Sequence, residues 1–222
     1  MRLGPILSRV QRSVAFVLLA GLASGCVASV VGADEQPPAT FDLVTPAAEG
    51  DVSPARGVQV LVPEPVTVAL LASQRVVVRV AAREVQYLAD TRYADTLTKL
   101  TQLKLKRAME ASPAVGAAAL PGEGLAIDYQ LLTDIRAFEV RAAPILVADA
   151  RGQTLPRSAF VSLTIKILDD RSGNVVASRV FDSTVPIGPV AEGGVGPAYL
   201  AALDAALDAA LVDIRSWVSS RI

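Results

Sequence analysis

The chain contains no histidine and only one cysteine, Cys26, among its 222 residues. Without histidine, the Ser-His-Asp and Cys-His arrangements of nucleophilic catalysis cannot form, and the usual general base at neutral pH is missing. A single cysteine excludes a disulfide within the chain. Metal sites built from nitrogen and sulfur ligands are equally unfavoured. The sequence therefore predicts a protein that is not an enzyme and that needs no metal or other cofactor.

Long apolar runs and an excess of basic charge are missing as well. The formal charge is −1, and no basic face or stripe of the kind that binds nucleic acid is evident. After residue 25, we expect no segment to reach the roughly 20 apolar residues of a transmembrane helix. Nucleic acid is therefore not an expected partner, and no membrane span is expected in the body of the protein.

The N-terminus has the organisation of a secretory signal. A short apolar run from Val14 to Leu22 follows three basic residues, Arg2, Arg9 and Arg12. A basic segment, a short apolar segment and small residues at the cleavage point describe a signal peptide. The run has about half the length that a membrane-spanning helix needs. We therefore expect residues 1–25 to be removed.

The residues around the cleavage point indicate lipidation. The sequence from residue 22 to Cys26 reads LASGC, which resembles the signal of bacterial lipoproteins. We expect cleavage between Gly25 and Cys26 and fatty acylation of Cys26, palmitate included. Two or more acyl chains hold a protein firmly on a membrane. Val27 stands where an aspartate would retain Gram-negative lipoproteins at the inner membrane, so the outer membrane is the expected destination.

The mature chain would contain 197 residues with a net charge of −4. Residues 26–40 are rich in small, polar and proline residues, which predicts a tether because such a segment buries little surface. As a flexible coil, this tether would span roughly 20 Å. Residues 41–222 suffice for a single domain with a core of its own.

Hydrophobic periodicity predicts an α/β (α+β) fold with a largely antiparallel sheet and two main helices packed on one face. Strands are expected at 41–43, 57–63, 66–71, 75–80, 83–88, 127–131, 159–167 and 174–181. The last two should form a hairpin whose turn, 169–173, explains its aspartates without a calcium ion. Residues 113–124 are expected to form a loop.

The first helix is predicted from Thr91 to about Ser112 and the second from about Pro197. The second helix should direct one stripe of large apolar side chains to the sheet: Leu200, Leu203, Leu207, Leu211, Ile214 and Val218. Asp204 and Asp208 should lie on its solvated side. The lysines of the first helix, Lys104 among them, are explained by solvation and the helix dipole, or by contact with an anionic lipid or acidic partner.

Several segments, taken in order, resemble the ABC-type transport auxiliary lipoproteins, the PqiC-like group that accompanies MCE-domain lipid transporters. They are the lipidation signal, GVQVLVP at 57–63, the strand pair 75–87, RYADTLTKL at 92–100, DYQLLTDIRAFEV at 128–140 and DIRSWV at 213–218. The resemblance implies a non-catalytic accessory subunit in phospholipid or sterol transport. It also implies a lipid-anchored protein on the periplasmic side of the envelope, with an MCE-domain periplasmic protein as partner.

Three residues are candidates for a partner interface or a homo-oligomer contact, Tyr87, Arg92 and Tyr93. Aromatic and arginine side chains are enriched in the residues that dominate binding energies, and the resemblance supports such a surface. Core packing is the preferred explanation for Trp217. A second function stays open at this point: a structural or assembly lipoprotein of the bacterial envelope with no transport role. Neighbouring genes for a permease, an ATPase and an MCE protein would favour transport.

Overall fold

A long central strand, β7 (Tyr129–Arg141), organises the sheet. β8 (Arg157–Asp169) pairs with it in antiparallel orientation along nearly its whole length, and β9 (Val175–Ile187) pairs antiparallel with β8. This computed structural model describes residues 37–43, 57–141, 157–190 and 194–222. The expected signal peptide and the lipidation site, Gly25 and Cys26, lie outside the described residues.

The other edge of β7 carries three short strands in succession, all parallel to it. They are β2 (Val58–Leu61), β3 (Val66–Thr67) and β4 (Arg75–Ala81). β6 (Val115–Ala119) pairs in parallel with β2, β5 (Glu84–Tyr93) forms an antiparallel hairpin with β4, and β1 (Ala39–Phe41) lies parallel to β5. The predicted α/β class is confirmed. The longest ladders are antiparallel, and the parallel strands beside β7 make the sheet mixed.

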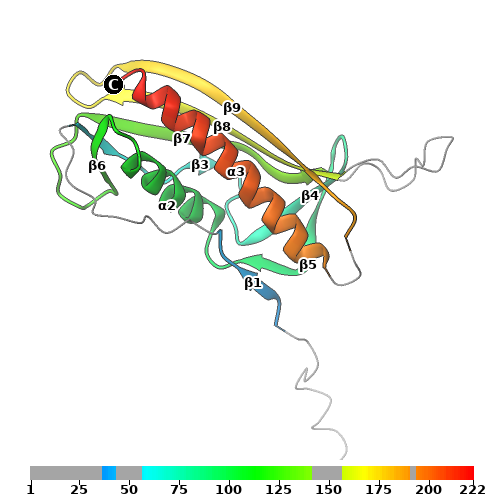
Figure 1. Cartoon of the computed structure of the whole chain (residues 1–222). Helices are drawn as coiled ribbons and strands as arrows, with labels where there is room; N and C mark the ends of the chain where they lie inside the picture. Colours follow the sequence, from blue (N-terminus) through cyan, green and yellow to red (C-terminus); the bar gives the residue numbers. More distant parts are fainter. Residues whose placement is uncertain (1–36, 44–56, 142–156, 191–193) are drawn as a thin grey trace, which may run out of the picture. The chain divides into compact units, whose positions relative to one another are not determined.

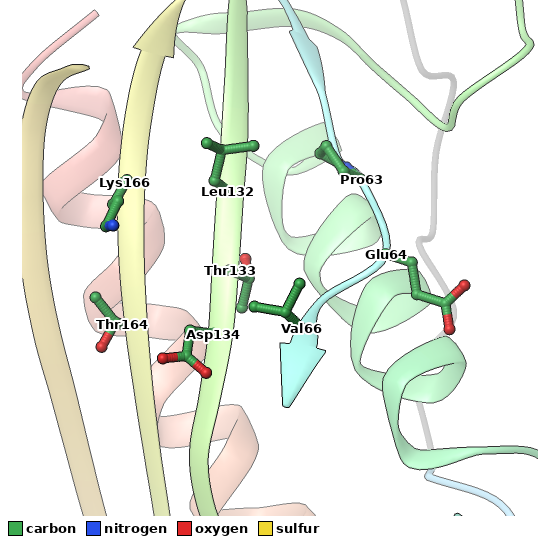
Figure 2. A pocket seen from close by; sticks show the side chains of 8 residues that line it. All are labelled: Pro63, Glu64, Val66, Leu132, Thr133, Asp134, Thr164 and Lys166. Atoms are coloured by element: carbon green, nitrogen blue, oxygen red, sulfur yellow. The ribbon is translucent and has the colours of Figure 1, made fainter. Parts of the chain in front are cut away.

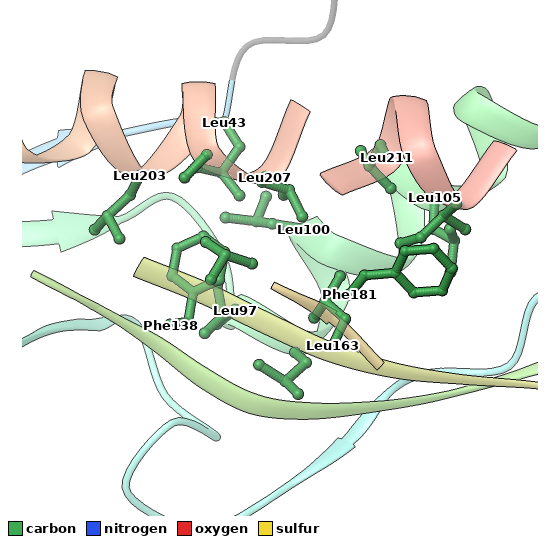
Figure 3. Close-up of a cluster of buried hydrophobic side chains, with 14 of the residues drawn as sticks. Leu43, Leu97, Leu100, Leu105, Phe138, Leu163, Phe181, Leu203, Leu207 and Leu211 are labelled. Carbon is green, nitrogen blue, oxygen red and sulfur yellow. The ribbon is translucent and has the colours of Figure 1, made fainter. Parts of the chain in front are cut away.

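Two helices, α2 (Leu97–Glu110) and α3 (Val195–Ser219), cover one face of the sheet among the described residues (Figure 1). α3 contacts β7, β8 and β9, whereas α2 contacts β6 and α3. Leu203, Leu207 and Leu211 of α3 point toward Phe138, Leu163 and Phe181 of the sheet (Figure 3). The predicted apolar stripe of the last helix is therefore confirmed.

The length of α3 contradicts the expectation that no segment after residue 25 reaches the length of a transmembrane helix. Its 25 residues are long and apolar enough to cross a membrane by length and composition alone. Its apolar stripe is nevertheless buried against the sheet, with Leu203, Leu207 and Ile214 fully enclosed. Trp217 near its end packs edge-on against Phe181, with ring centroids 5.5 Å apart, as expected for a core residue. These contacts make α3 the central core helix of the domain.

The start of α2 differs from the prediction. Residues Thr91 to Tyr93 belong to β5, and the helix begins only at Leu97. The backbone N–H of Tyr93 donates to the carbonyl of Gln74 at 2.7 Å, so the strand continues to this point. Tyr93 and Leu97 are both buried. Two buried residues four apart suggested a helix, although they lie on either side of a strand-to-helix corner.

The segment expected to be a loop, 113–124, contains strand β6. Its sequence VGAAA has only small side chains beyond Val115, which hides the usual strand pattern. Just before the two strands, the backbones approach so closely that only glycine fits: a Cβ on Gly57 would lie 2.6 Å from the carbonyl oxygen of Ala114. Two boundaries also shift. The strand expected at 66–71 ends at Thr67 in a turn, and β1 takes in Ala39 and Thr40, which we had assigned to the tether.

The hairpin between β8 and β9 turns as predicted. The Oδ1 atom of Asp169 accepts a hydrogen bond from the backbone N–H of Ser172 at 2.7 Å. Gly173 has φ +69°, a left-handed conformation that glycine adopts without strain. The backbone hydrogen bonds from Ser172 and the neighbouring interactions lower the pKa of Asp169. The aspartates of this segment are therefore explained by the turn.

Candidate interaction surface

The sheet face opposite the helices is the candidate functional surface, and we call it the helix-free face. Side chains alternate along a strand, so residues next to the buried Leu131, Ile135, Leu163 and Ile165 point to this face. None of the described helices covers it (Figure 1). The exposed side chains of this face are therefore candidates for recognition.

A hollow of about 370 Å³ lies on the helix-free face, and we call it the β3 hollow. Figure 2 shows its walls: one side comes from β7 and β8, the other from the segment that leads into β3. The lining residues are Pro63, Glu64, Val66, Leu132, Thr133, Asp134, Thr164 and Lys166. Val66 and Val68 are 66% and 61% exposed, among the most exposed large apolar residues described. The lining of the hollow therefore combines apolar side chains with acidic and basic groups.

Glu64 is the best anchored charge of the β3 hollow. Thr98 donates to its Oε1 at 2.6 Å, and Lys99 Nζ lies 2.8 Å from its Oε2. The hydrogen bonds from Lys99 and Thr98 hold the pKa of Glu64 below its ordinary value. This carboxylate is consequently charged and fixed in position by α2.

A second polar feature of the helix-free face is a carboxylate held between two arginines. Glu139 is buried and accepts two hydrogen bonds from Arg79, at 2.7 and 2.8 Å, and one from Arg141 at 3.1 Å. Burial opposes its ionisation, but the hydrogen bonds from the two arginines outweigh this and lower the pKa of Glu139. The guanidinium of Arg141 also stacks 3.5 Å from the ring centroid of Phe160. We call this group the Glu139 clamp.

Two of the predicted interface residues, Tyr87 and Arg92, lie on β5. Arg92 is exposed, and its Nε donates to Thr40 Oγ1 on β1 at 3.0 Å. Tyr87 is half-buried: its hydroxyl donates to the Leu70 carbonyl at 3.3 Å, and Arg75 stacks on its ring at 3.6 Å. Both therefore remain candidates for contact with a partner.

The prediction that Tyr93 is an interface residue is wrong, because only 1% of this residue is exposed. Its ring packs edge-on against Phe138, with centroids 6.2 Å apart. Its hydroxyl has no hydrogen-bond partner among the described residues. Burial, aided by the charge of Asp204, raises the pKa of Tyr93 above its usual range. Tyr93 follows Arg92 directly, and alternation turns the two side chains to opposite faces of the sheet.

The expectation that Lys104, Asp204 and Asp208 lie on solvated helix surfaces is wrong. Lys104 is buried between the helices, where its Nζ bonds to Asp204 and lies 2.7 Å from Asp208 Oδ1. The two aspartates thus face α2 rather than bulk solvent alone, since a four-residue spacing lets both reach one cation. This ion pair joins α2 to α3 and serves the fold.

The arginines Arg75, Arg79 and Arg141 were missed by the sequence analysis. The near-continuous valines of RVVVRV favour a strand buried on both faces, and Val76 to Val78 are indeed buried. The sequence feature that indicates this arginine-bearing face is the four-residue spacing of Arg75 and Arg79, which puts both on the same face of a strand. Among the described residues, no group of three acidic or cysteine side chains is arranged to hold a metal ion.

Comparison with known proteins identifies the family. The model of the ABC-type transport auxiliary lipoprotein component matches residues 41–215, which is well over half of the chain. The chain belongs to this family. Its members are auxiliary lipoprotein components of ABC-type transport systems.

Individual relatives support the fold over the same region. The crystal structure of XCC0632 from Xanthomonas campestris has 25% sequence identity and a TM-score of 0.66, and the match covers 82% of this chain and 96% of that one. A crystal structure of an uncharacterised protein aligns with a TM-score of 0.59 at 12% identity, over 82% of this chain and 99% of the other. The protein bll6063 of Bradyrhizobium diazoefficiens is 29% identical over 178 residues, 80% of this chain. The present chain spans only 44% of the length of bll6063.

Proposed function

We propose that this auxiliary lipoprotein is a non-catalytic, periplasmic accessory subunit of an ABC/MCE-type lipid transport system. Cleavage after Gly25 and acylation of Cys26 attach it to the membrane, the outer membrane in preference to the inner. The transported lipid is a phospholipid or a sterol. The observation that carries the proposal is the family match over residues 41–215.

The chemistry of the chain supports a binding role over catalysis. No histidine is available as a base. Glu139 on the helix-free face is held by two arginines, and Glu64 at the β3 hollow is held by Lys99 and Thr98 of α2. Carboxylates whose pKa is lowered by such bonds are poor proton acceptors.

The partner in this proposal is the MCE-domain periplasmic protein of the transporter, and it binds the helix-free face around the β3 hollow. Protein interfaces combine an apolar centre with a polar rim. Val66 and Val68 supply exposed apolar surface, and Asp134 and Lys166 supply the rim. The proposed contact residue Tyr87 extends the surface along β5, and Arg92 lies further along the same strand.

The test is capture of the MCE-domain protein by a chain that begins at residue 26 and carries Cys26→Ser. Val66→Glu should weaken capture about tenfold, because a charge replaces an apolar contact at the interface centre. The matched control is Val212→Glu, since Val212 is 56% exposed on α3, on the helix-covered side. Equal loss in both variants would refute the surface. Failure of the unsubstituted chain to bind any MCE protein would refute the transport role and favour envelope assembly.

A further inference from the structure

Arg75 and Arg92 are directly opposite each other in the antiparallel β4–β5 ladder. Both are exposed. Like charges directly opposite each other across two strands destabilise a sheet. The structure therefore contains an arrangement that costs folding free energy unless an anion joins it.

The two arginines point to the helix-free face. Thr91 approaches α3 so closely that a Cβ on Gly196 would lie 2.7 Å from its Oγ1. Tyr93 is buried in the core. Arg92 lies between these two residues in the strand, so its side chain projects from the opposite face, together with that of Arg75.

In the Glu139 clamp, a carboxylate joins two arginines, and the pair of Arg75 and Arg92 has no such carboxylate among the described residues. Arg79 and Arg141 are also directly opposite each other, in the β4–β7 ladder, and Glu139 hydrogen-bonds to both. Arg75 and Arg92 form no salt bridge with any carboxylate of the described residues. Within the described ranges, Arg75 lies 3.6 Å from the centroid of the Tyr87 ring, and Arg92 Nε donates to Thr40 Oγ1 at 3.0 Å. Stacking and hydrogen bonding orient the two guanidinium groups, and most of their N–H donors have no partner among these residues.

We propose that Arg75 and Arg92 bind the phosphate of an anionic phospholipid headgroup in the bilayer that anchors the protein. The proposal rests on the proposed lipid anchor at Cys26. Arginine recognises phosphate through paired N–H donors. A single phosphate between the two guanidinium groups would play the part that Glu139 plays between Arg79 and Arg141.

The position of the pair favours a membrane over an acidic protein. β1 places Thr40 in register with Arg92, so the chain leads from this point toward Cys26. From Cys26 to Pro38 is 12 residues along the sequence. A segment of that length reaches at most about 43 Å and spans roughly 20 Å as a coil. An acyl anchor at Cys26 therefore keeps this corner of the domain close to the headgroups.

The experiment measures vesicle binding by the chain that begins at residue 26 with Cys26→Ser, which carries no acyl chain. Vesicles of pure phosphatidylcholine are compared with equimolar phosphatidylcholine and phosphatidylglycerol. The unsubstituted chain should bind the anionic vesicles, and added salt should weaken this binding. Arg75→Gln with Arg92→Gln should lower the affinity about tenfold. Because the substitution removes a like-charge contact, the variant should unfold at equal or higher denaturant concentration.

The matched control is Arg171→Gln with Arg221→Gln, which removes the same charge from exposed sites at the β8–β9 turn and the C-terminal end. Equal loss of vesicle binding in the control would overturn the proposal, and so would equal binding to both kinds of vesicle. Loss of MCE capture by the Arg75 and Arg92 variant with vesicle binding intact would assign the pair to the protein partner instead. Vesicle binding that depends on the pair supports the proposal whether or not the chain captures an MCE protein.

Discussion

At the scale of single residues, Tyr93 carries a polar atom that the core does not satisfy. Its hydroxyl is buried with no hydrogen-bond partner in the part of the chain that the structure describes, and an unsatisfied buried group costs about 1 to 3 kcal/mol. Tyr93→Phe should therefore leave the free energy of unfolding unchanged or raise it, by about 1 kcal/mol at most. Tyr93→Ala should lower it by about 3 to 5 kcal/mol, as truncation of a buried ring does. Urea titration measures both, and a clear loss in Tyr93→Phe would reveal a bound water or other partner.

Glu139 should make stability depend on pH. Its pKa is lowered in the folded state, so its contribution to stability is present above the unfolded value of about 4.3. This contribution is lost as pH falls through the lower, folded pKa. Glu139→Gln should thus be less stable than the natural protein at neutral pH, by about 1 to 3 kcal/mol. The difference between their free energies of unfolding should shrink below about pH 4. A difference that is constant from pH 7 to pH 3 would contradict the ionic role of the clamp.

At the scale of elements, α3 contributes two neighbouring residues whose truncation should destabilise the fold to very different extents. Leu207 is fully buried against the sheet, so Leu207→Ala should destabilise by about 2 to 5 kcal/mol. Asp208→Ala should cost about 1 kcal/mol or less, since its carboxylate is partly solvated and Asp204 still pairs with Lys104. Unfolding of the two variants in guanidinium chloride measures both free energies. Equal losses would show that the ion pair matters as much to the α2–α3 contact as the apolar stripe does.

The elements also show what the sequence could predict. The hairpin of β8 and β9 and the stripe of α3 have long, regular periodicity, and both were predicted from it. β6 was not, because alanine and glycine give no alternation to detect. The parallel attachment of β2, β3 and β4 to one edge of β7 was also not predicted, since alternation reports the faces of a strand and not its direction. For the candidate surface, Arg92 could be named from sequence, whereas its pairing with Arg75 depends on register.

At the scale of the whole molecule, attachment to the membrane should depend on Cys26. Cys26→Ser should release the protein into the soluble periplasmic fraction or leave it unprocessed, because acyl chains supply nearly all of the anchoring. Mass spectrometry of the N-terminal peptide should find the natural protein beginning at acylated Cys26. The circular dichroism spectrum of a released variant should match that of the natural protein. An unmodified Cys26 in membrane fractions would contradict this prediction.

The convergence of three strands on β7 has a kinetic consequence. Val60 pairs with Tyr129 and Val78 with Val140, so the first part of the chain has its partners far along the sequence. Chains dominated by such non-local pairings fold slowly, because long loops must close before any contact forms. β2, β3 and β4 cannot complete their ladders until residues 129–141 are available. Refolding from denaturant should therefore be slow, on the order of milliseconds to seconds, as in other chains rich in non-local strand pairs.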